Sequence, residues 1–477
     1  MVIKMQDVQQ NPLGYEKIGK LILKFSIPAI LSFLVHAVYN IVDQIYIGRG
    51  FLNFEGIGEL GMAATNIAFP LVTIATALAL LLAVGTASNF NLRLGAGKNK
   101  EAAEVAGNGL LMMLISGVFL CLLAFGFNHQ LLSVFGVTEK IEPYASSYMS
   151  IICFGIPFQI LTTGACQLIR SDGSPAYSMI CLMSGAVLNI ILDPILIYYL
   201  DMGIAGAAAA TVLSQFLCTV IALFYILKKF KHVKLHKNCF KPDVSLMGKI
   251  CALGTAACFN QLAMTVVQIV MNNTLKIYGA DSIYGSEIPL ACVGAISKIN
   301  VVFLAFVIGT AQGCQPINGF NYGAKKYDRV KQTYITALTA ATAFSTLIFL
   351  VFQLFPREVM GIFGEGSDAY FLFAERYLKI FMMLIFLNGI QPVTANFFTS
   401  IGKARVGIII SLTRQIVFLV PLLLTLPLLF GIDGVVYAGP VSDGAAFLLA
   451  GVFIIREIKK LNQLQKELLL KETQTNL

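Results

Sequence analysis

Long apolar runs recur from one end of the chain to the other, and they limit the folds that are open to it. Each run has about 20 or more residues, which is enough to cross a hydrocarbon core about 30 Å thick. Of the 477 residues, 57% are hydrophobic and 12% are charged, whereas a soluble globular protein is about a quarter charged. The pattern predicts an all-α polytopic membrane protein, because a membrane β-barrel shows alternating segments of about ten residues.

The boundaries of these runs predict twelve transmembrane helices. They lie near residues 21–47, 60–88, 105–128, 144–168, 174–200, 204–228, 247–275, 288–318, 333–355, 370–398, 404–428 and 433–456. Cytoplasmic loops of membrane proteins collect Lys and Arg. With the N-terminus in the cytoplasm, most of the 34 Lys and Arg residues fall on the cytoplasmic side. Both termini are therefore expected in the cytoplasm.

The net charge of +9 is interpreted as a mark of this topology, and no nucleic-acid partner is expected. Residues 227–241 contain six lysines, and this stretch is interpreted as a cytoplasmic linker, with a polybasic lipid-binding patch as the alternative. The ten cysteines are scattered and form no CxxC pair, which argues against a zinc site or a disulfide framework. No cleaved signal peptide is expected, because the apolar run after the polar N-terminal segment is too long for one.

The two halves of the chain resemble each other. Residues 83–98, "AVGTASNFNLRLGAGK", align without a gap over residues 311–326, "AQGCQPINGFNYGAKK", at an offset of 228. The same offset places "GIAG" at 203–206 over "GIDG" at 431–434. Because each half holds an even number of spans, the repeats are parallel and related by a pseudo-two-fold axis along the membrane normal.

This repeat predicts two six-helix lobes that rock against each other, which is the basis of alternating access in transporters. The predicted lobes cover residues 1–230 and 247–460. A basic cytoplasmic linker, 231–246, joins them, and a cytoplasmic tail, 461–477, follows. A membrane transporter, expected to act as a monomer in contact with lipid, is therefore the leading hypothesis.

Two aspartates lie inside predicted spans of the first lobe. A charge at the bilayer centre costs about 2.5 to 3.5 kcal/mol on insertion scales, so each needs a partner or a function. Asp43 and Asp193 both fall six to eight residues before the external ends of their spans, so we expect them to lie at one depth. Asn189 precedes Asp193 by one helical turn, and Thr211 reaches the same level on the next span. Such a group of oxygens predicts a site for a proton or for Na⁺.

Other residues of the first span are candidates for the same site. His36 and Asn40 share a helical stripe with Asp43 at i, i+4 and i+7. Pro28 can leave a backbone carbonyl free and bend the helix. The alternatives are a core histidine at position 36 and a kink without function at position 28.

The second lobe has a different set of charges. The offset places Met271 and Pro421 at the positions of Asp43 and Asp193, so no cation site is repeated there. Lys298, Arg414 and Asp443 each lie about ten residues into a predicted span, and they predict a buried ionic network. The network is either structural or linked to transport. Further amides that can line a cleft or bridge helices are Gln261, Gln268, Gln312, Gln315, Asn388 and Gln391.

Five segments together resemble the multidrug and toxic compound extrusion (MATE) family, and the last of them is most similar to its bacterial MepA-like branch. The segments are "YNIVDQIYIG" at 39–48, "RLGAGKNKEA" at 93–102, "LNIILDPILI" at 188–197, "GIAGAAAATVLSQ" at 203–215 and "GTAQGCQPINGFNYGA" at 309–324. The likeness covers nearly the whole chain. It implies a twelve-helix antiporter in the cell membrane of a prokaryote.

The resemblance also implies a function and a set of residues. Such antiporters export cationic, amphiphilic drugs in exchange for H⁺ or Na⁺ and need no cofactor. The family's cation site matches Asp43, Asn189, Asp193 and Thr211, and its bending proline matches Pro28. Some relatives instead use carboxylates in the second lobe, and no residue of this chain is matched to those carboxylates.

Two other functions stay open at this point, a flippase and an ion channel, although a two-lobed repeat in one chain offers no obvious symmetric pore for a channel. A lipid-linked oligosaccharide flippase shares the architecture, and Lys298 with Arg414 would be a sparse cationic site for its pyrophosphate. An intramembrane enzyme such as a prenyltransferase is not expected, because the sequence has no DDxxD-like cluster of aspartates for magnesium.

Overall fold

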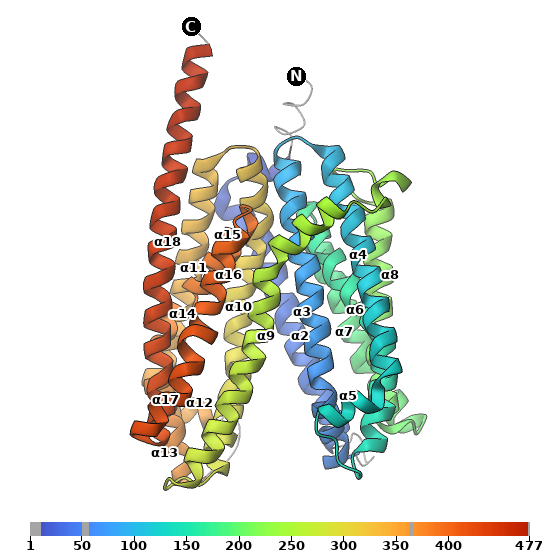
Figure 1. Cartoon of the computed structure of the whole chain (residues 1–477), viewed down its shortest axis with the longest axis vertical. Helices are drawn as coiled ribbons and strands as arrows, with labels where there is room; N and C mark the ends of the chain where they lie inside the picture. The colour runs from blue at the N-terminus through green and yellow to red at the C-terminus, as the bar shows by residue number, and fades with distance from the viewer. Residues whose placement is uncertain (1–10, 50–56, 362–366, 476–477) are drawn as a thin grey trace. The chain divides into compact units, whose positions relative to one another are not determined.

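The computed structural model describes residues 11–49, 57–361 and 367–475, which form helices joined by short loops (Figure 1). A short 3₁₀ turn, η1 (Pro12–Gly14), precedes the first long helix. The first half of the chain then forms α2 (Ile18–Arg49), α3 (Glu59–Gly95), α4 (Asn99–Gly126), α5 (Asn128–Val134), α6 (Glu142–Ser171), α7 (Pro175–Pro194), the π-helical η2 (Ile195–Tyr199) and α8 (Gly203–Lys228).

The second half repeats this order with more breaks. A 3₁₀ turn, η3 (Lys237–Phe240), leads into α9 (Val244–Ala280), α10 (Glu287–Gly323), α11 (Tyr327–Leu354) and the short α12 (Pro356–Gly361). Next come α13 (Asp368–Arg376), the π-helical η4 (Tyr377–Phe381), α14 (Ile385–Asn388) and α15 (Ile390–Ser400). The chain ends with α16 (Ala404–Leu412), the π-helical η5 (Thr413–Leu419), α17 (Val420–Phe430) and α18 (Ile432–Thr475).

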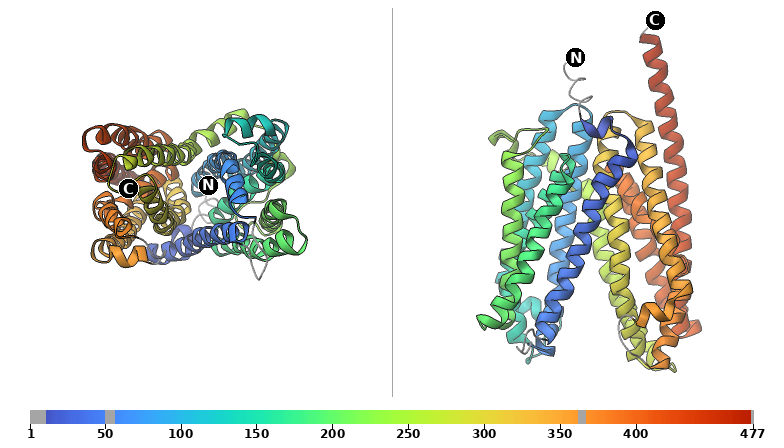
Figure 2. Two further views of the ribbon diagram at one scale, coloured as in Figure 1. Left: turned by 90° about the horizontal axis from the view of Figure 1, so that it is seen from below. Right: turned by 180° about the vertical axis from the view of Figure 1, so that it is seen from behind.

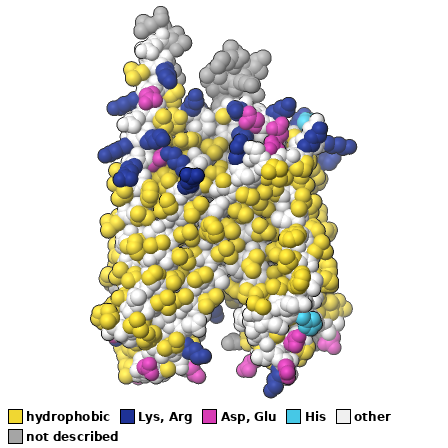
Figure 3. Space-filling view, viewed as in Figure 1, with side chains coloured by type: hydrophobic (Ala, Val, Ile, Leu, Met, Phe, Trp, Pro, Cys, Tyr) yellow, Lys and Arg dark blue, Asp and Glu magenta, His cyan; other side chains and the backbone are white. Residues whose placement is uncertain are grey.

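The described helices fit the predicted spans. Eleven of them are long and apolar enough to cross a membrane, and a twelfth span arises if the pair Asp368–Phe381 and Ile385–Ser400, bent by 55°, counts as one. The prediction of an all-α polytopic membrane protein is therefore confirmed. On the face shown in Figure 3, hydrophobic side chains cover the middle of the helices, and Lys and Arg gather near helix ends.

The chain packs into two compact units whose boundaries lie inside helices. The N-terminal unit comprises Leu31–Cys258, and the C-terminal unit comprises Met1–Ile30 with Phe259–Leu477. Helix α2 thus begins in the C-terminal unit and ends in the N-terminal unit, and α9 does the reverse. This division by packing differs from the lobes predicted from the sequence, which change at the lysine-rich linker.

Glycines explain why the start of α9 packs with the N-terminal unit. A Cβ at Gly85 of α3 would lie 2.0 Å from the carbonyl oxygen of Ile250, and one at Gly254 would lie 1.6 Å from that of Leu81. The Asn89 side-chain amide also donates to the carbonyl of Lys249 at 3.1 Å. Only residues without a side chain permit this approach of two helix backbones.

The C-terminal unit contains the equivalent crossing. A Cβ at Gly313 of α10 would lie 2.7 Å from the backbone nitrogen of Ser26 in α2. Gly313 and Ser26 correspond to Gly85 and Gly254 at the same offset of 228. Before α2 begins, the carbonyl of Leu13 accepts from Asn321 and Arg329 at 2.9 and 3.2 Å. The short turn before α2 is therefore fastened to the C-terminal unit.

Helix α18 continues well past its predicted span. Figures 1 and 2 show one unbroken helix that runs on toward the C-terminus. Leu461 is buried, and Lys331 of α11 donates to the Asn462 side chain at 3.2 Å. The predicted tail, 461–477, thus continues α18 through its described residues.

Candidate functional site

An apolar cluster fixes the C-terminal end of α2 against η2 and α8. It is built from Tyr46, Ile47, Ile197, Tyr198 and Ala207. The Tyr198 hydroxyl donates to the backbone carbonyl of Tyr46. Asp43 lies about one turn inward from Tyr46, and Asp193 about one turn before Ile197. This packing brings the two aspartates from different helices into one region of the N-terminal unit.

Three of the predicted site residues, Asp43, Asn189 and Asp193, are buried, and each has one side-chain oxygen without a hydrogen-bond partner among the described residues. The Asn189 amide donates to Oδ1 of Asp193 at 3.1 Å, and the two residues are 1% and 0% exposed. Asp43 is also buried, and its carboxyl lies close enough to Asp193 for the two to interact electrostatically. Asp43 Oδ1, Asn189 Oδ1 and Asp193 Oδ2 are buried without a hydrogen-bond partner among the described residues. An acceptor left in this state is destabilising, by about 1 to 3 kcal/mol.

Two hydroxyl groups of α8 and two tyrosines are further candidates for donors of oxygen. Thr211 of α8 is half-buried, and Ser214, one turn further along, is buried with its Oγ unpaired among the described residues. Tyr39 and Tyr148 also interact electrostatically with both aspartates. Carboxylate, amide and hydroxyl oxygens are the donors that hard cations prefer. The set therefore fits either a proton or a small cation.

The remaining predicted residues of α2 differ from this group in exposure or in position along the helix. His36 and Asn40 are exposed, and the Asn40 amide donates to the carbonyl of His36 at 2.7 Å. The His36 ring meets Tyr39 edge-on, with centroids 4.9 Å apart. His36 is thus not a core histidine. Pro28 lies in the part of α2 that packs with the C-terminal unit, and the helix is continuous through it.

In the C-terminal unit, two of the three predicted ionic residues form a pair. Arg414 Nε lies 2.6 Å from Asp443 Oδ1, and Asn388 faces the same carboxyl. Lys298 is exposed on α10 and makes no ion pair or hydrogen bond within the described part of the chain. The structure thus contains an Arg–Asp pair with Lys298 outside it, whereas the sequence predicted one network. A lysine with a long, mobile stem does not need a fixed partner where water reaches it.

The predicted amides have mixed roles. Gln391 donates to the carbonyls of Ile410 and Ser411 at 3.0 and 3.2 Å, just before α16 passes into η5. Gln268 is exposed and donates to Asn272 at 2.9 Å. Gln261 is half-buried, whereas Gln312 and Gln315 are buried in α10. Gln391 therefore joins two helices, and the others are spread along α9 and α10.

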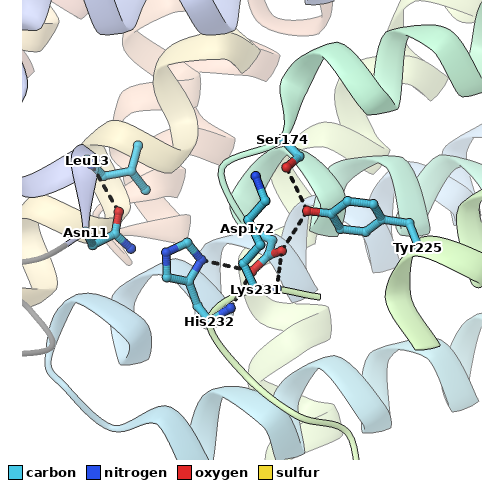
Figure 4. Close-up of polar contacts among 7 residues, drawn as sticks. All are labelled: Asn11, Leu13, Asp172, Ser174, Tyr225, Lys231 and His232. Atoms are coloured by element: carbon cyan, nitrogen blue, oxygen red, sulfur yellow. Dashed lines mark hydrogen bonds and ion pairs between the residues drawn. The ribbon is translucent and has the colours of Figure 1, made fainter. Parts of the chain in front are cut away.

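A polar cluster outside the predicted site centres on Asp172, which follows α6 (Figure 4). Tyr225 of α8 donates its hydroxyl to Asp172 Oδ2 at 2.9 Å, and the backbone N–H of Lys231 donates to the same oxygen at 2.7 Å. The backbone N–H of His232 lies 3.0 Å from Oδ1, and its ring Nδ1 lies 2.9 Å away. One buried carboxylate thus holds the start of the lysine-rich linker on the N-terminal unit.

No larger ligand cluster competes with these sites. Among the described residues, no three His, Cys, Asp or Glu side chains are arranged to hold a metal ion. All ten cysteines are free, and most of them are buried.

The model of the MatE family matches residues 28–195 and again residues 256–425. Together the two matches cover more than half of the chain. The chain belongs to the MatE family. The double match follows the internal repeat, and each aspartate of the N-terminal unit's candidate site lies within the first match.

Curated MatE relatives align over nearly their full length. The multidrug export protein MepA of Staphylococcus saprophyticus is 25% identical over 455 residues, which cover 95% of this chain and 97% of that protein. MepA of Staphylococcus aureus strain MRSA252 is 24% identical over the same coverage. The chain is therefore similar to whole transporters of the MatE family.

Solved structures of MatE proteins have the same fold. The MATE multidrug transporter DinF-BH, solved as a complex with a small molecule, is 34% identical with a TM-score of 0.83, covering 92% of this chain and 95% of that one. An outward-facing multidrug resistance MATE family transporter has a TM-score of 0.86 at 23% identity, covering 96% of this chain and 98% of that one. As a MatE protein, the chain is a multi-pass membrane transporter.

Sequence reasoning missed several residues of this MatE protein. Ser214 gave no signal beyond its spacing of three from Thr211, which places both on one helix face. Tyr198 shows that an aromatic residue can fix a helix end through a backbone carbonyl, and sequence pattern does not report such contacts. Asp172 directly precedes Gly173, whose φ of 84° marks a turn. A carboxylate in such a turn is a candidate for backbone contacts.

Proposed function

We propose that this MatE protein is a secondary active multidrug efflux transporter. It exports organic, mostly cationic and amphiphilic compounds in exchange for H⁺ or Na⁺, by alternating access of its two lobes, with both termini in the cytoplasm. The names of its curated relatives and of DinF-BH support multidrug export. The observation that carries the ion coupling is the set of three buried oxygens on Asp43, Asn189 and Asp193 that lack a hydrogen-bond partner in the described part of the chain.

Protonation can satisfy these oxygens in a simple way. A proton on Asp43 or Asp193 turns one carboxyl oxygen into a donor, and an unpaired oxygen of a neighbour can accept from it. A sodium ion would be coordinated by the same oxygens, and the hydroxyl oxygens of Thr211 and Ser214 would be further ligands. In either case the bound ion neutralises charge that α2 contributes.

Neutralisation can change the preferred packing of α2 because this helix takes part in both units. A bound ion shifts a two-state equilibrium only through its different affinity for the two states. A difference of about 5.5 kcal/mol moves the ratio from 1:99 to 99:1. Binding of the ion at Asp43 and Asp193 thus drives release of the organic cation and the return of the ion-loaded transporter to its inward-open state.

Dye efflux from proteoliposomes tests this proposal. The pH gradient and the sodium gradient are imposed separately, and the parent is compared with Asp43→Asn. We expect gradient-driven efflux by the parent and at least about tenfold slower efflux by the variant, a loss of about 1.4 kcal/mol. Glu59→Gln, which changes a carboxyl at the start of α3, is the control. Equal efflux by parent and Asp43→Asn excludes Asp43 from the mechanism.

A second arm separates export from lipid flipping. The same proteoliposomes carry a labelled lipid-linked sugar, and its movement between leaflets is followed. Movement of this lipid without any dye efflux would favour the flippase over the drug transporter.

A further inference from the structure

Positive charge is concentrated in the linker that follows α8. Residues 228–241 contain six lysines and no Asp or Glu. All six side chains are exposed, and among the described residues none of them makes an ion pair. The proposed export mechanism uses none of these lysines. The bias toward Lys in cytoplasmic loops explains the sign of this charge but not the way in which the linker is held.

Both ends of the linker join helices that are long and apolar enough to cross a membrane. Helix α8 ends at Lys228, and α9 begins at Val244. The lysines therefore lie between two membrane crossings, close to the level of the phospholipid head groups. Clusters of about four to eight basic residues next to a membrane helix attract anionic lipid.

Apolar side chains of the linker turn toward the protein. The Phe230 ring stacks on Phe90 of α3, with centroids 5.7 Å apart, and meets Tyr225 of α8 edge-on at 6.4 Å. Val233 and Cys239 are buried. Because the lysines between these residues are exposed, the linker packs through one side and presents its charge on the other.

Hydrogen bonds also fix the backbone of the linker near both of its ends. Asp172 accepts from the backbone N–H of Lys231 at 2.7 Å (Figure 4). Further along, the Asn108 side chain of α4 donates to the carbonyl of Cys239 at 3.2 Å and accepts from the backbone N–H of Asp243 at 2.9 Å. A ligand of the lysines would thus bind without first ordering this backbone, which lowers the entropic cost of binding.

Lys229 extends from the linker toward apolar surface of the spans. Its Nζ lies 5.7 Å from the ring centroid of Tyr177 and 5.6 Å from that of Phe224. Phe224 is 51% exposed near the end of the span α8, so we expect its ring to contact acyl chains. Lysines at the ends of membrane helices commonly lay their stems along apolar surface and hold the ammonium group at the head groups. Lys229 has the position of such a side chain.

The exposed side chains of the linker favour lipid over nucleic acid. Proteins that bind single-stranded nucleic acid combine basic residues with aromatic rings on which bases stack. The two phenylalanines of the linker, Phe230 and Phe240, are not exposed. Lysine ammonium groups on flexible stems suit the phosphates of phospholipids, which are present wherever α8 and α9 leave the membrane.

We propose that the linker forms a binding site for the head groups of anionic phospholipids. Its lysines bind the lipid phosphates, and Asp172 and Asn108 position the backbone that carries them. The lysines are Lys228, Lys229, Lys231, Lys234, Lys237 and Lys241. This site does not depend on which compounds the transporter exports.

A tryptophan beside Lys229 can report which lipid is bound. The chain contains no tryptophan, so Phe224→Trp introduces a single fluorescent indole next to the Lys229 ammonium group. The full chain with this substitution is reconstituted in mixed vesicles of phosphatidylcholine and phosphatidylglycerol, in which one lipid or the other is brominated and quenches tryptophan. We expect phosphatidylglycerol to bind at least about tenfold more tightly than phosphatidylcholine at this position. Equal affinity for the two lipids overturns the proposal.

Two matched double variants test whether the lysines of the linker are responsible. Lys229→Gln with Lys231→Gln should lower the preference for phosphatidylglycerol at least about threefold. Lys459→Gln with Lys460→Gln removes the same charge from exposed positions of α18 and should leave the preference unchanged. Quenching by brominated phosphatidylcholine confirms that each variant is inserted. Similar losses in the two double variants, or no loss in the first, overturn the proposal.

Asp172→Asn separates a held site from general attraction to an anionic surface. The substitution removes a negative charge beside the linker, so general attraction would become stronger. A linker released from Asp172 should instead lose about half of its preference or more, because its backbone is no longer fixed. A preference equal to that of the parent or greater overturns the positioned site.

Competition distinguishes lipid from soluble ligands of the same chemistry. Inorganic phosphate or a single-stranded oligonucleotide is added in excess to the vesicles at constant ionic strength. Quenching by brominated phosphatidylglycerol should persist in both cases. Its loss on addition of either compound would assign the lysines to a soluble anion and overturn the proposal.

Discussion

The two units of the molecule repeat each other's backbone but not each other's chemistry. Gly85 with Gly254, and Gly313 with Ser26, form equivalent helix crossings in the two units. At membrane depth, however, the N-terminal unit carries Asp43 and Asp193, where the C-terminal unit has Met271 and Pro421. The small residues that permit close packing are repeated, and the charged residues are not.

The polar groups of the two units also differ in how completely they are paired. Asp443 of the C-terminal unit is matched with Arg414. The Asp43, Asn189 and Asp193 oxygens of the N-terminal unit lack partners among the described residues. A buried carboxylate that is paired with a cation contributes to the fold as it stands, whereas the unpaired oxygens are where we propose that an ion binds. The repeated backbone thus carries an ion pair in one unit and a group of unpaired oxygens in the other.

The largest effect on stability should come from breaking the complete pair. Arg414→Ala leaves Asp443 buried without its partner, and we expect a loss of about 3 to 5 kcal/mol in the free energy of unfolding. Thermal unfolding in detergent measures it. The neutral pair Arg414→Gln with Asp443→Asn is the control and should lose much less. Similar losses in both would show that the charge pairing is not what matters.

The repeated helix crossing should give the next largest effect. Gly254→Ala places a methyl group against the Leu81 carbonyl, and we expect a loss of about 1 to 3 kcal/mol from overpacking. Gly248→Ala is the control on the same helix, because no atom lies within 4 Å of its Cβ position. Higher helix propensity should make this control neutral or slightly stabilising. Apparent melting temperatures of the two variants should therefore move in different directions.

The hydrogen bonds of Asp172 should contribute less. Tyr225→Phe removes one donor to Asp172 Oδ2, and we expect a loss of about 1 kcal/mol. Protease cleavage within the lysine-rich linker should become faster, because the linker is held by the same carboxylate. Tyr327→Phe, in the other unit, is the control. An unchanged cleavage rate in Tyr225→Phe would contradict a role of Asp172 in fixing the linker.

The smallest effect on stability is expected at Asp193, where transport should fail instead. Asp193→Asn removes a carboxylate whose Oδ2 has no partner among the described residues, so the free energy of unfolding should change by less than about 1 kcal/mol. Its melting temperature should then stay near that of the parent while gradient-driven efflux is lost. A large loss of stability at Asp193, as large as that of Arg414→Ala, would remove the contrast between the two units.

The spans were predictable because the membrane imposes a length and a composition on every crossing segment. The ends were less so: α3 runs from Glu59 to Gly95, whereas its apolar run suggests 60–88. A helix continues into water wherever its neighbours support it, as α18 does through the contact of Lys331 with Asn462. Hydropathy does not record such support.

The candidate site was predictable in part. The depth of Asp43 and Asp193 follows from counting residues along each helix, which is why both could be assigned to one level. The depth of a charged residue does not determine which partner it pairs with. The sequence therefore predicted one network of Lys298, Arg414 and Asp443, whereas in the structure only Arg414 and Asp443 form an ion pair. The place of His36 on the exposed side of α2 depends on neighbouring helices, which a periodicity of one helix does not include.

The exchange of segments between the two units has a consequence for any attempt to make the protein as two separate polypeptides. If the coding sequence were divided at the lysine-rich linker, each product would lack a piece that completes its own compact unit: Met1–Ile30 would be made with one polypeptide and Phe259–Leu477 with the other. Two such half-length polypeptides could reach this fold only by interlocking, so neither should form a stable protein when it is synthesised alone.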